Sequence, residues 1–293
     1  MAQAILRLPN FPLIMGIINI TPDSFYAPSR VEGTADALLR ARALAEAGAA
    51  IIDIGGESTR PGAAPVSPEE ECARVVPVIG TLAAEFDLPI SIDTRHALVA
   101  EQALAAGASI INDISGLGDP AMRRLAAESG AVAVLMHMQG EPADMQQSPH
   151  YQDAAREVES FFIERIRLAL EAGMQRGRIW LDPGIGFGKR LKDNLALIRA
   201  LPDFARLGYP LLVGFSRKSF IREALALGDE ARGERTVGAP DAALSDQDAL
   251  LATCLYNFAA LERGAAVIRV HDAREAALTM QVWRSLSMPR AQK

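Results

Sequence analysis

Eight short apolar runs recur along the 293 residues and constrain the fold more than any other feature. They are rich in Ile and Val, apolar throughout rather than alternating, and separated by Ala- and Leu-rich stretches of helical period. Parallel strands covered on both faces have this pattern. The predicted strands are Leu13–Ile20, Ile51–Gly55, Ile90–Asp93, Ile110–Asp113, Ala131–Met136, Ile179–Asp182, Leu211–Gly214 and Val267–Val270. A (β/α)₈ barrel commonly needs about 250 residues, so we predict an α/β fold with one TIM barrel as a single domain over residues 1–293.

The segments between these runs predict the helices of such a barrel. Ser67 and the acidic residues after it are typical of a helix start, and glycines in AEAGAA, ALAAGAS and LERGAA are typical helix ends. The expected helices are Thr34–Ala47, Pro68–Glu85, Ala97–Ala106, Met122–Ser129, Ala154–Ala172, Lys192–Leu201 and Gln247–Arg263. Two irregular stretches, Gln139–Gln152 and Gly228–Asp246, are expected to be long loops, which in a barrel often serve function.

Composition excludes several classes of protein. No apolar run approaches the roughly 20 residues that span a bilayer, and the start MAQAILRLPNFP does not have the pattern of a signal peptide. Cys72 and Cys254 lie far apart, so neither a disulfide framework nor a zinc site is expected. The net charge of −6 argues against a nucleic-acid or membrane surface. We therefore expect a cytoplasmic globular protein, whose cleft can still hold an anion on a few arginines.

Hydrogen-bonding or charged residues stand at the end of every predicted strand. In a barrel all strand ends meet at one rim, where the active sites of this fold lie. Any one of these residues alone is often a cap or a turn former, but eight such coincidences favour a site. The residues are Asn19, Asp53, Asp93, Asn112, His137, Asp182, the Ser216-Arg217-Lys218 run, Arg269 and His271.

The set is chemically mixed and indicates a ligand with two different ends. Asp93 and Asp182 follow apolar strands, so each carboxylate needs donors, which a guanidine-like ring edge supplies in pairs. Asn112 can both donate and accept. Lys218 and Ser219 open a helix in GFSRKSF, and a helix start binds anions. Arg60 is a second candidate cation and lies in the loop GGESTRPG. The alternatives are that Asp182 only caps the turn in DPGIGFG and that the cations form surface ion pairs.

An ordered set of motifs resembles a known family. MGIINITPDSF, DIGGESTRPGA, SIDT, INDISG, MHMQGEP, DPGIGFGK, GFSRKSFI and RVHD occur in the order seen in dihydropteroate synthases, within the pterin-binding enzymes. The resemblance implies the same barrel and a transferase of folate biosynthesis. Such an enzyme condenses 6-hydroxymethyl-7,8-dihydropterin diphosphate with p-aminobenzoate, needs Mg²⁺, is a sulfonamide target and forms a homodimer. The helices before and after the last strand are the expected dimer interface.

The resemblance also implies roles for individual residues. The residues expected to bind the pterin are Asp93, Asn112, Met136, Asp182, Phe187 and Lys218. Those expected at the diphosphate are Asn19, Thr59, Arg60, Arg269 and His271, with Mg²⁺ near Asn19. Thr59, Pro61 and Ser219 are expected to hold the aminobenzoate.

Three other functions remain open at this point. A methyltransferase that moves a methyl group from methyl-tetrahydrofolate to a corrinoid protein shares the barrel and the ring site but does not need the cationic cluster. A non-catalytic pterin-binding paralogue is favoured by DSFYAPSR, because the family usually continues DSF with SDGG. A Schiff-base aldolase acting through Lys218 is weaker, because Lys218 lies beside Arg217 rather than alone in an apolar pocket.

Overall fold

Eight parallel strands close into a barrel in the computed structural model, which describes residues 12–20, 33–58, 64–231 and 245–287. Each strand pairs with its neighbour in sequence, and β8 pairs with β1 to close the ring. The strands are β1 (Leu13–Asn19), β2 (Ile51–Gly55), β3 (Ile90–Asp93), β4 (Ile110–Asp113), β5 (Val132–Met136), β6 (Ile179–Asp182), β7 (Leu211–Val213) and β8 (Ala265–Val270). The predicted TIM barrel is confirmed, and every predicted strand is present.

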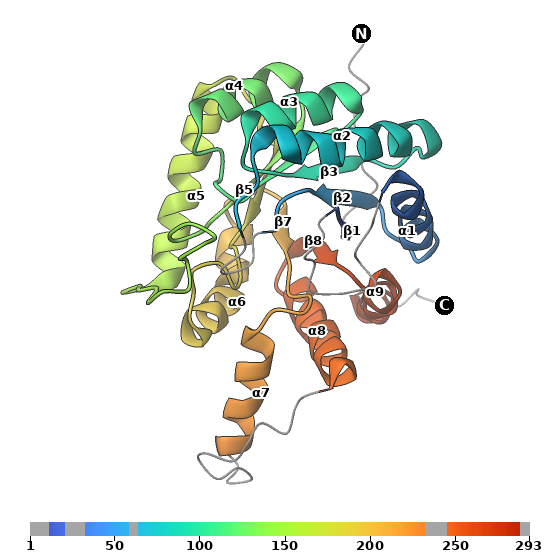
Figure 1. Cartoon of the computed structure of the whole chain (residues 1–293). Helices are drawn as coiled ribbons and strands as arrows, with labels where there is room; N and C mark the ends of the chain where they lie inside the picture. The colour runs from blue at the N-terminus through green and yellow to red at the C-terminus, as the bar shows by residue number, and fades with distance from the viewer. Residues whose placement is uncertain (1–11, 21–32, 59–63, 232–244, 288–293) are drawn as a thin grey trace, which may run out of the picture.

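Helices surround the strands, as Figure 1 shows. They are α1 (Thr34–Glu46), α2 (Pro68–Glu85), α3 (Ala97–Ala106), α4 (Pro120–Ser129), α5 (Ala154–Glu171), α6 (Leu191–Ala205), α7 (Phe220–Ala231), α8 (Asp246–Leu261), α9 (Ala273–Ser287) and the short 3₁₀ helix η2 (Arg176–Arg178). The Ser67 hydroxyl accepts from the backbone N–H of Glu70 at 3.2 Å, so the predicted cap is confirmed. Gly48, Gly107 and Gly264 have positive φ, as expected of helix ends.

The predicted helix ends lie within two residues of those in the structure, except at the end of α6 and in the segment Gly228–Ala231. α6 passes Leu201 and includes Pro202, because a proline in the last turn removes only one helical hydrogen bond. The expected loop beginning at Gly228 was wrong over Gly228–Ala231, which continue α7. One helical glycine costs only about 1 kcal/mol, and the good helix formers Ala226, Leu227 and Glu230 lie near it in the sequence. The rest of that stretch to residue 244 lies outside the described residues, whereas Gln139–Gln152 is irregular as expected.

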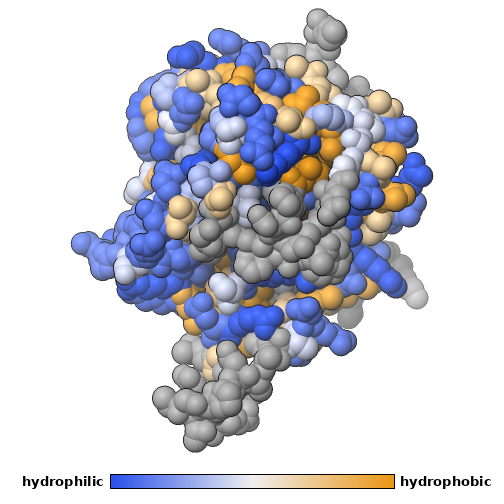
Figure 2. Space-filling view, in the orientation of Figure 1, coloured by the Kyte–Doolittle hydropathy of each residue, from blue (hydrophilic) through white to orange (hydrophobic). Residues whose placement is uncertain are grey.

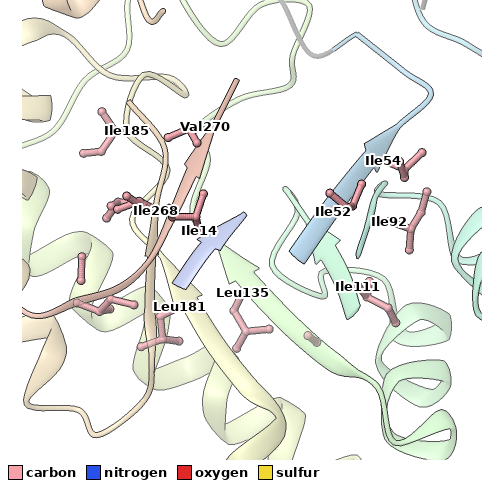
Figure 3. Packing of buried hydrophobic residues seen from close by; sticks show 14 of the residues in the cluster. Ile14, Ile52, Ile54, Ile92, Ile111, Leu135, Leu181, Ile185, Ile268 and Val270 are labelled. Carbon is pink, nitrogen blue, oxygen red and sulfur yellow. The ribbon is translucent and has the colours of Figure 1, made fainter. Parts of the chain in front are cut away.

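The apolar core has two layers. Side chains such as Met15, Ile51 and Trp180 fill the inside of the barrel, and each is almost fully buried. A larger layer lies between the strands and the helices and includes Ile52, Ile54 and other labelled residues of Figure 3. Because alternate residues of a strand face opposite sides, seven of the eight strands contribute to both layers, which explains their apolar sequences. The exception is β3, which contributes Ile90 and Ile92 to the outer layer and places the buried, polar Ser91 on the other face.

The face of the molecule seen in Figure 2 is mainly polar. Hydrophilic residues cover much of the face in Figure 2, with hydrophobic residues between them in smaller areas. Among the described helices, none has both the length and the apolar character that crossing a bilayer requires.

Candidate active site at the carboxyl end of the barrel

On the inner face of the barrel, the apolar side chains are followed toward the carboxyl ends of the strands by polar side chains. Ile51, Ile110, Trp180 and Val267 face the barrel interior, and the residue two positions later on each strand faces the same way. Those residues are Asp53, Asn112, Asp182 and Arg269. The register adds Asp93, which pairs with Asn112 across β3 and β4. The predicted convergence of polar strand ends is therefore present.

Arg269 ties two carboxylates together at the centre of this rim. Its Nε donates to Oδ2 of Asp53 at 2.6 Å, and its Nη2 donates to Oδ2 of Asp93 at 2.6 Å. Asp53 is fully buried, and the Asn112 amide reaches the same oxygen at 3.4 Å. Nη1 of Arg269 donates to no described residue. The guanidinium thus compensates a buried charge while keeping one donor for a ligand.

Asp182 and Lys218 form the second charged group of the site. Oδ1 of Asp182 accepts from the backbone N–H of Gly184 at 2.7 Å, so one carboxylate oxygen has a fixed donor. The Lys218 ammonium donates to the carbonyl of Ile185 and lies 4.4 Å from the centre of the Phe187 ring. This cation–π contact holds the lysine over the loop that follows β6.

Burial shifts the ionisation of these groups. It raises the pKa of Asp93 to about 7, against the opposing effect of Arg269. It also raises the pKa of Asp182, although Lys218 and the Gly184 N–H oppose the change. Burial lowers the pKa of Lys218 to about 8, with Asp182 opposing. For Arg269, burial lowers the pKa but Asp53 and Asp93 outweigh it, so the net shift is upward. Such shifts cluster at functional sites.

Lys189 fastens the loop that carries Gly184 and Phe187. Its buried Nζ donates to the carbonyls of Gly184 and Phe187, both at 2.9 Å, and to that of His137 at 3.1 Å. Nδ1 of His137 lies 3.1 Å away, and burial together with Lys189 lowers the pKa of that imidazole to about 3. His137 is therefore neutral near pH 7, and its Nδ1 can only share one of the three lysine protons with a carbonyl.

The remaining predicted residues lie around this centre. Met136 is buried and pairs in register with Asp182, and Phe187 is half-buried beneath Lys218. Asn19 pairs in register with Gly55, next to Asp93, and its amide makes no hydrogen bond with a described residue. Ser219 is exposed just before α7. Thr59, Arg60, Pro61 and the DSFYAPSR segment lie outside the described residues.

His271 lies on the same side, next to β7. Its Nδ1 is 3.0 Å from the Ser216 hydroxyl, and its backbone N–H donates to the same oxygen at 3.3 Å. Arg40 donates to the carbonyl of His271 at 2.5 Å. Arg217, from the same predicted run, forms an ion pair with Asp272 at 3.0 Å. Arg217 therefore forms an ion pair, as the alternative expected, but the pair is partly buried rather than on the open surface.

Sequence reasoning missed two parts of the site. Asp53 was noted only as a strand end, yet it is the buried partner of Arg269. Lys189 was not singled out, and the only signal available was its place at the end of DPGIGFGK, a loop rich in glycine whose carbonyls need a donor.

Comparisons with known proteins bear directly on this arrangement. Residues 15–271 match the model of the pterin-binding enzyme family. The chain is 44% identical over 271 residues to the dihydropteroate synthase of Escherichia coli K12, covering 92% of this chain and 90% of the relative. The Yersinia pestis dihydropteroate synthase, solved with a sulfonamide drug complex, has a TM-score of 0.84 and 40% identity over 94% of each chain.

The chain belongs to the dihydropteroate synthase family. Membership makes it a transferase of folate biosynthesis with dihydropteroate synthase activity. The Xanthomonas albilineans dihydropteroate synthase, solved with 4-aminobenzoic acid, has a TM-score of 0.81 and 39% identity, covering 95% of this chain and 94% of that one. The family therefore favours the synthase over the corrinoid methyltransferase and the Schiff-base aldolase.

Proposed function

We propose that this rim condenses 6-hydroxymethyl-7,8-dihydropterin diphosphate with p-aminobenzoate, releasing diphosphate and 7,8-dihydropteroate. The single observation that carries the assignment to residues is the contact of Arg269 with Asp53 and Asp93. This contact places carboxylate acceptors and a cationic donor side by side on the inner face of the barrel. A pterin diphosphate has a donor-rich ring at one end and an anion at the other, and the two kinds of group match it.

The carboxylates and Asn112 bind the pterin ring in this proposal. A pterin presents an amino group beside a ring N–H, which is a pair of donors suited to a carboxylate. Asp182 keeps one oxygen for this edge, because its other oxygen is held by Gly184. Lys218 donates to ring acceptors, and Phe187 and Met136 supply the apolar walls.

The diphosphate lies beyond Arg269. Nη1 of Arg269 donates to no described residue, so it is available to donate to the diphosphate. His271, Thr59 and Arg60 complete the set in our proposal. Loss of the diphosphate needs its charge neutralised, and a single preorganised donor of this kind is typically worth about 10²–10³ in rate.

Asn19 fits a Mg²⁺ ion of the kind held mostly by substrate phosphates. Mg²⁺ takes oxygen ligands and often uses only one or two protein groups plus phosphate oxygens. The Asn19 amide stands at the end of β1 without a hydrogen bond to a described residue, so its oxygen can serve as such a ligand. A bound Mg²⁺ would neutralise charge on the departing diphosphate.

The reaction needs no covalent nucleophile from the protein. An arylamine is a weak nucleophile, so the exocyclic CH₂–O bond breaks early and leaves a cation delocalised into the pterin. Asp93 and Asp182 stabilise that positive charge as it grows. Ser219, which precedes α7, is proposed to dock the aminobenzoate carboxylate, because helix N-termini attract anions. Thr59 and Pro61 enclose this second substrate, and sulfonamides compete for the same place.

We also infer a homodimer through α8 and α9. Leu251 and Leu255 on α8 and Leu278, Val282 and Leu286 on α9 are all more than half exposed and follow four-residue spacing. The two helices pack against each other, so the two stripes lie on neighbouring helices. A cytoplasmic location, single-domain organisation over residues 1–293 and the lack of a nucleic-acid partner complete the proposal.

Release of diphosphate tests the proposed function. The chain is incubated with 6-hydroxymethyl-7,8-dihydropterin diphosphate and Mg²⁺, with and without p-aminobenzoate. We expect release that depends on the aminobenzoate and yields dihydropteroate. Tight binding of the pterin diphosphate with no release would instead support the non-catalytic paralogue.

A further inference from the structure

Three side chains with metal-ligating atoms meet outside the site described above. Glu57 follows β2, Glu71 lies in the first turn of α2, and His96 directly precedes α3. One ligand atom from each lies within 4.8 Å of the other two. The sequence does not indicate this group, because its members come from three separate segments.

The buried carboxylate of Glu71 gives this cluster its independent support. Glu71 is 0% exposed, and neither of its carboxylate oxygens has a hydrogen-bond partner among the described residues. Nε2 of His96 is also buried and without a partner there. Burial raises the pKa of Glu71 to about 8, and the Thr94 side chain is the main opposing influence. A buried carboxyl group is stable as the neutral acid or beside a cation, and a divalent ion bound here would take the place of the proton.

The donor set indicates which cation fits. The imidazole nitrogen favours Zn²⁺ over Mg²⁺ or Ca²⁺, and Zn²⁺ also accepts carboxylate oxygens, with bonds to both kinds of atom about 2.0–2.2 Å long. Nε2 of His96 lies 3.9 Å from Oε2 of Glu57. Closing all three ligands onto one ion therefore needs movements of less than about 1 Å by each side chain.

Arg95 is the charged group that competes for Glu57. Its Nε lies 3.2 Å from Oε2 of Glu57, whereas its Nη1 makes the shorter contact, 2.8 Å, with Glu141. Arg95 can keep Glu141 when Glu57 turns toward a metal. With a divalent ion, the three charges of Glu57, Glu71 and Glu141 balance those of the ion and Arg95.

We propose that Glu57, Glu71 and His96 form a Zn²⁺ site that fastens the segment after β2 to the starts of α2 and α3. The site is separate from the Mg²⁺ expected at Asn19, and it does not depend on the proposed catalytic function. A water molecule or another oxygen completes the tetrahedral shell.

Zinc binding by the full chain tests this proposal. Protein stripped with a chelator is titrated with Zn²⁺ by calorimetry in the presence of excess Mg²⁺, and zinc content is measured after dialysis. We expect one zinc per chain and a higher temperature of thermal unfolding. Absence of stoichiometric zinc would overturn the proposal.

Two histidine variants separate this site from adventitious binding. His96→Ala removes a ligand that is partly exposed, so the variant should fold, and its zinc affinity should fall at least tenfold, as even outer partners of a metal site cost 10–100-fold. His150→Ala is the matched control, because His150 is exposed and outside the cluster. Unchanged zinc binding in His96→Ala would contradict the proposal. Visible absorption of the Co²⁺-loaded protein, lost in His96→Ala and kept in His150→Ala, is the second readout.

Discussion

Arg269 donates from Nε to Oδ2 of Asp53 at 2.6 Å, across 216 positions of sequence. Asp53 is fully buried, so its charge depends on this partner. Because Nη2 of the same guanidinium reaches Asp93, the arginine links structural and ligand-binding carboxylates. Changes at Arg269 should therefore alter stability, ring binding and turnover together.

Replacement of Arg269 by Ala should lower the free energy of unfolding by about 3–5 kcal/mol, because it leaves the Asp53 charge buried with no cation and only the Asn112 amide beside it. Urea unfolding monitored by circular dichroism measures this change. Adding Asp53→Asn to the variant removes the orphaned charge and should recover part of the loss. Equal stability of the single and double variants would show that the ion pair does not compensate Asp53.

Pterin affinity should depend on pH through Asp93 and Lys218. Burial raises the pKa of Asp93 to about 7, so below pH 7 the free protein holds a proton that ring donors must displace, and affinity falls by up to about tenfold per pH unit. Burial lowers the pKa of Lys218 to about 8, so above pH 8 its positive charge is lost. Calorimetry should therefore find the tightest binding between about pH 7 and 8.

Two variants assign the limbs of that profile. Asp93→Asn should bind more weakly overall and lose the acidic limb, because an amide does not titrate. Lys218→Arg should lose the alkaline limb, because a guanidinium stays charged. An acidic limb that persists in Asp93→Asn would assign it to another group.

Gly184 should not tolerate a side chain. It has φ +65°, and a Cβ there would lie 1.9 Å from the carbonyl oxygen of His137. Gly184→Ala should lose more than about 3 kcal/mol of stability and weaken pterin binding, because the Gly184 N–H holds Asp182. Urea unfolding of Gly177→Ala is the control, since a Cβ at Gly177 meets nothing within 4 Å. Equal stability of the two variants would contradict the steric account.

A charge on the apolar stripe of α8 should disrupt the proposed dimer. Leu255 is 64% exposed, and burying its side chain against a second copy is worth about 1.5–3 kcal/mol. Leu255→Glu should shift the mass measured by light scattering from dimer to monomer. Ile163→Glu, on the exposed side of α5, should leave the mass unchanged. A monomeric wild-type chain would contradict the proposed homodimer.

The sequence predicts the barrel and the inner rim well because both depend on local patterns. Residues two positions apart on a strand face the same side, so Asn112 faces inward with Ile110 and Asp182 with Trp180. A strand's apolar run therefore already indicates which polar residue faces the site. The partner of Arg269 depends instead on how β8 and β2 flank β1, and no local pattern contains it. The backbone carbonyls around Lys189 and the proximity of Glu71 to His96 likewise arise only from tertiary packing.

Helix ends were less predictable for an energetic reason. Pro202 and Gly228 both favour the end of a helix, yet both lie inside one. The free-energy cost of each residue is local, and the rest of the helix outweighs it. Glycines at Gly48 and Gly107 did end their helices, because the chain there adopts positive φ.

The most direct test of the account is kcat/KM for dihydropteroate formation by the wild-type chain, Asp182→Asn and Asp203→Asn. Asp182 lies on the inner face of β6, whereas Asp203 is an exposed carboxylate near the end of α6 that pairs with Arg206, the residue after the helix. We predict that Asp182→Asn loses about 10²–10³ in kcat/KM and that Asp203→Asn keeps the wild-type value. Wild-type kcat/KM in Asp182→Asn would contradict the placement of the pterin at this rim.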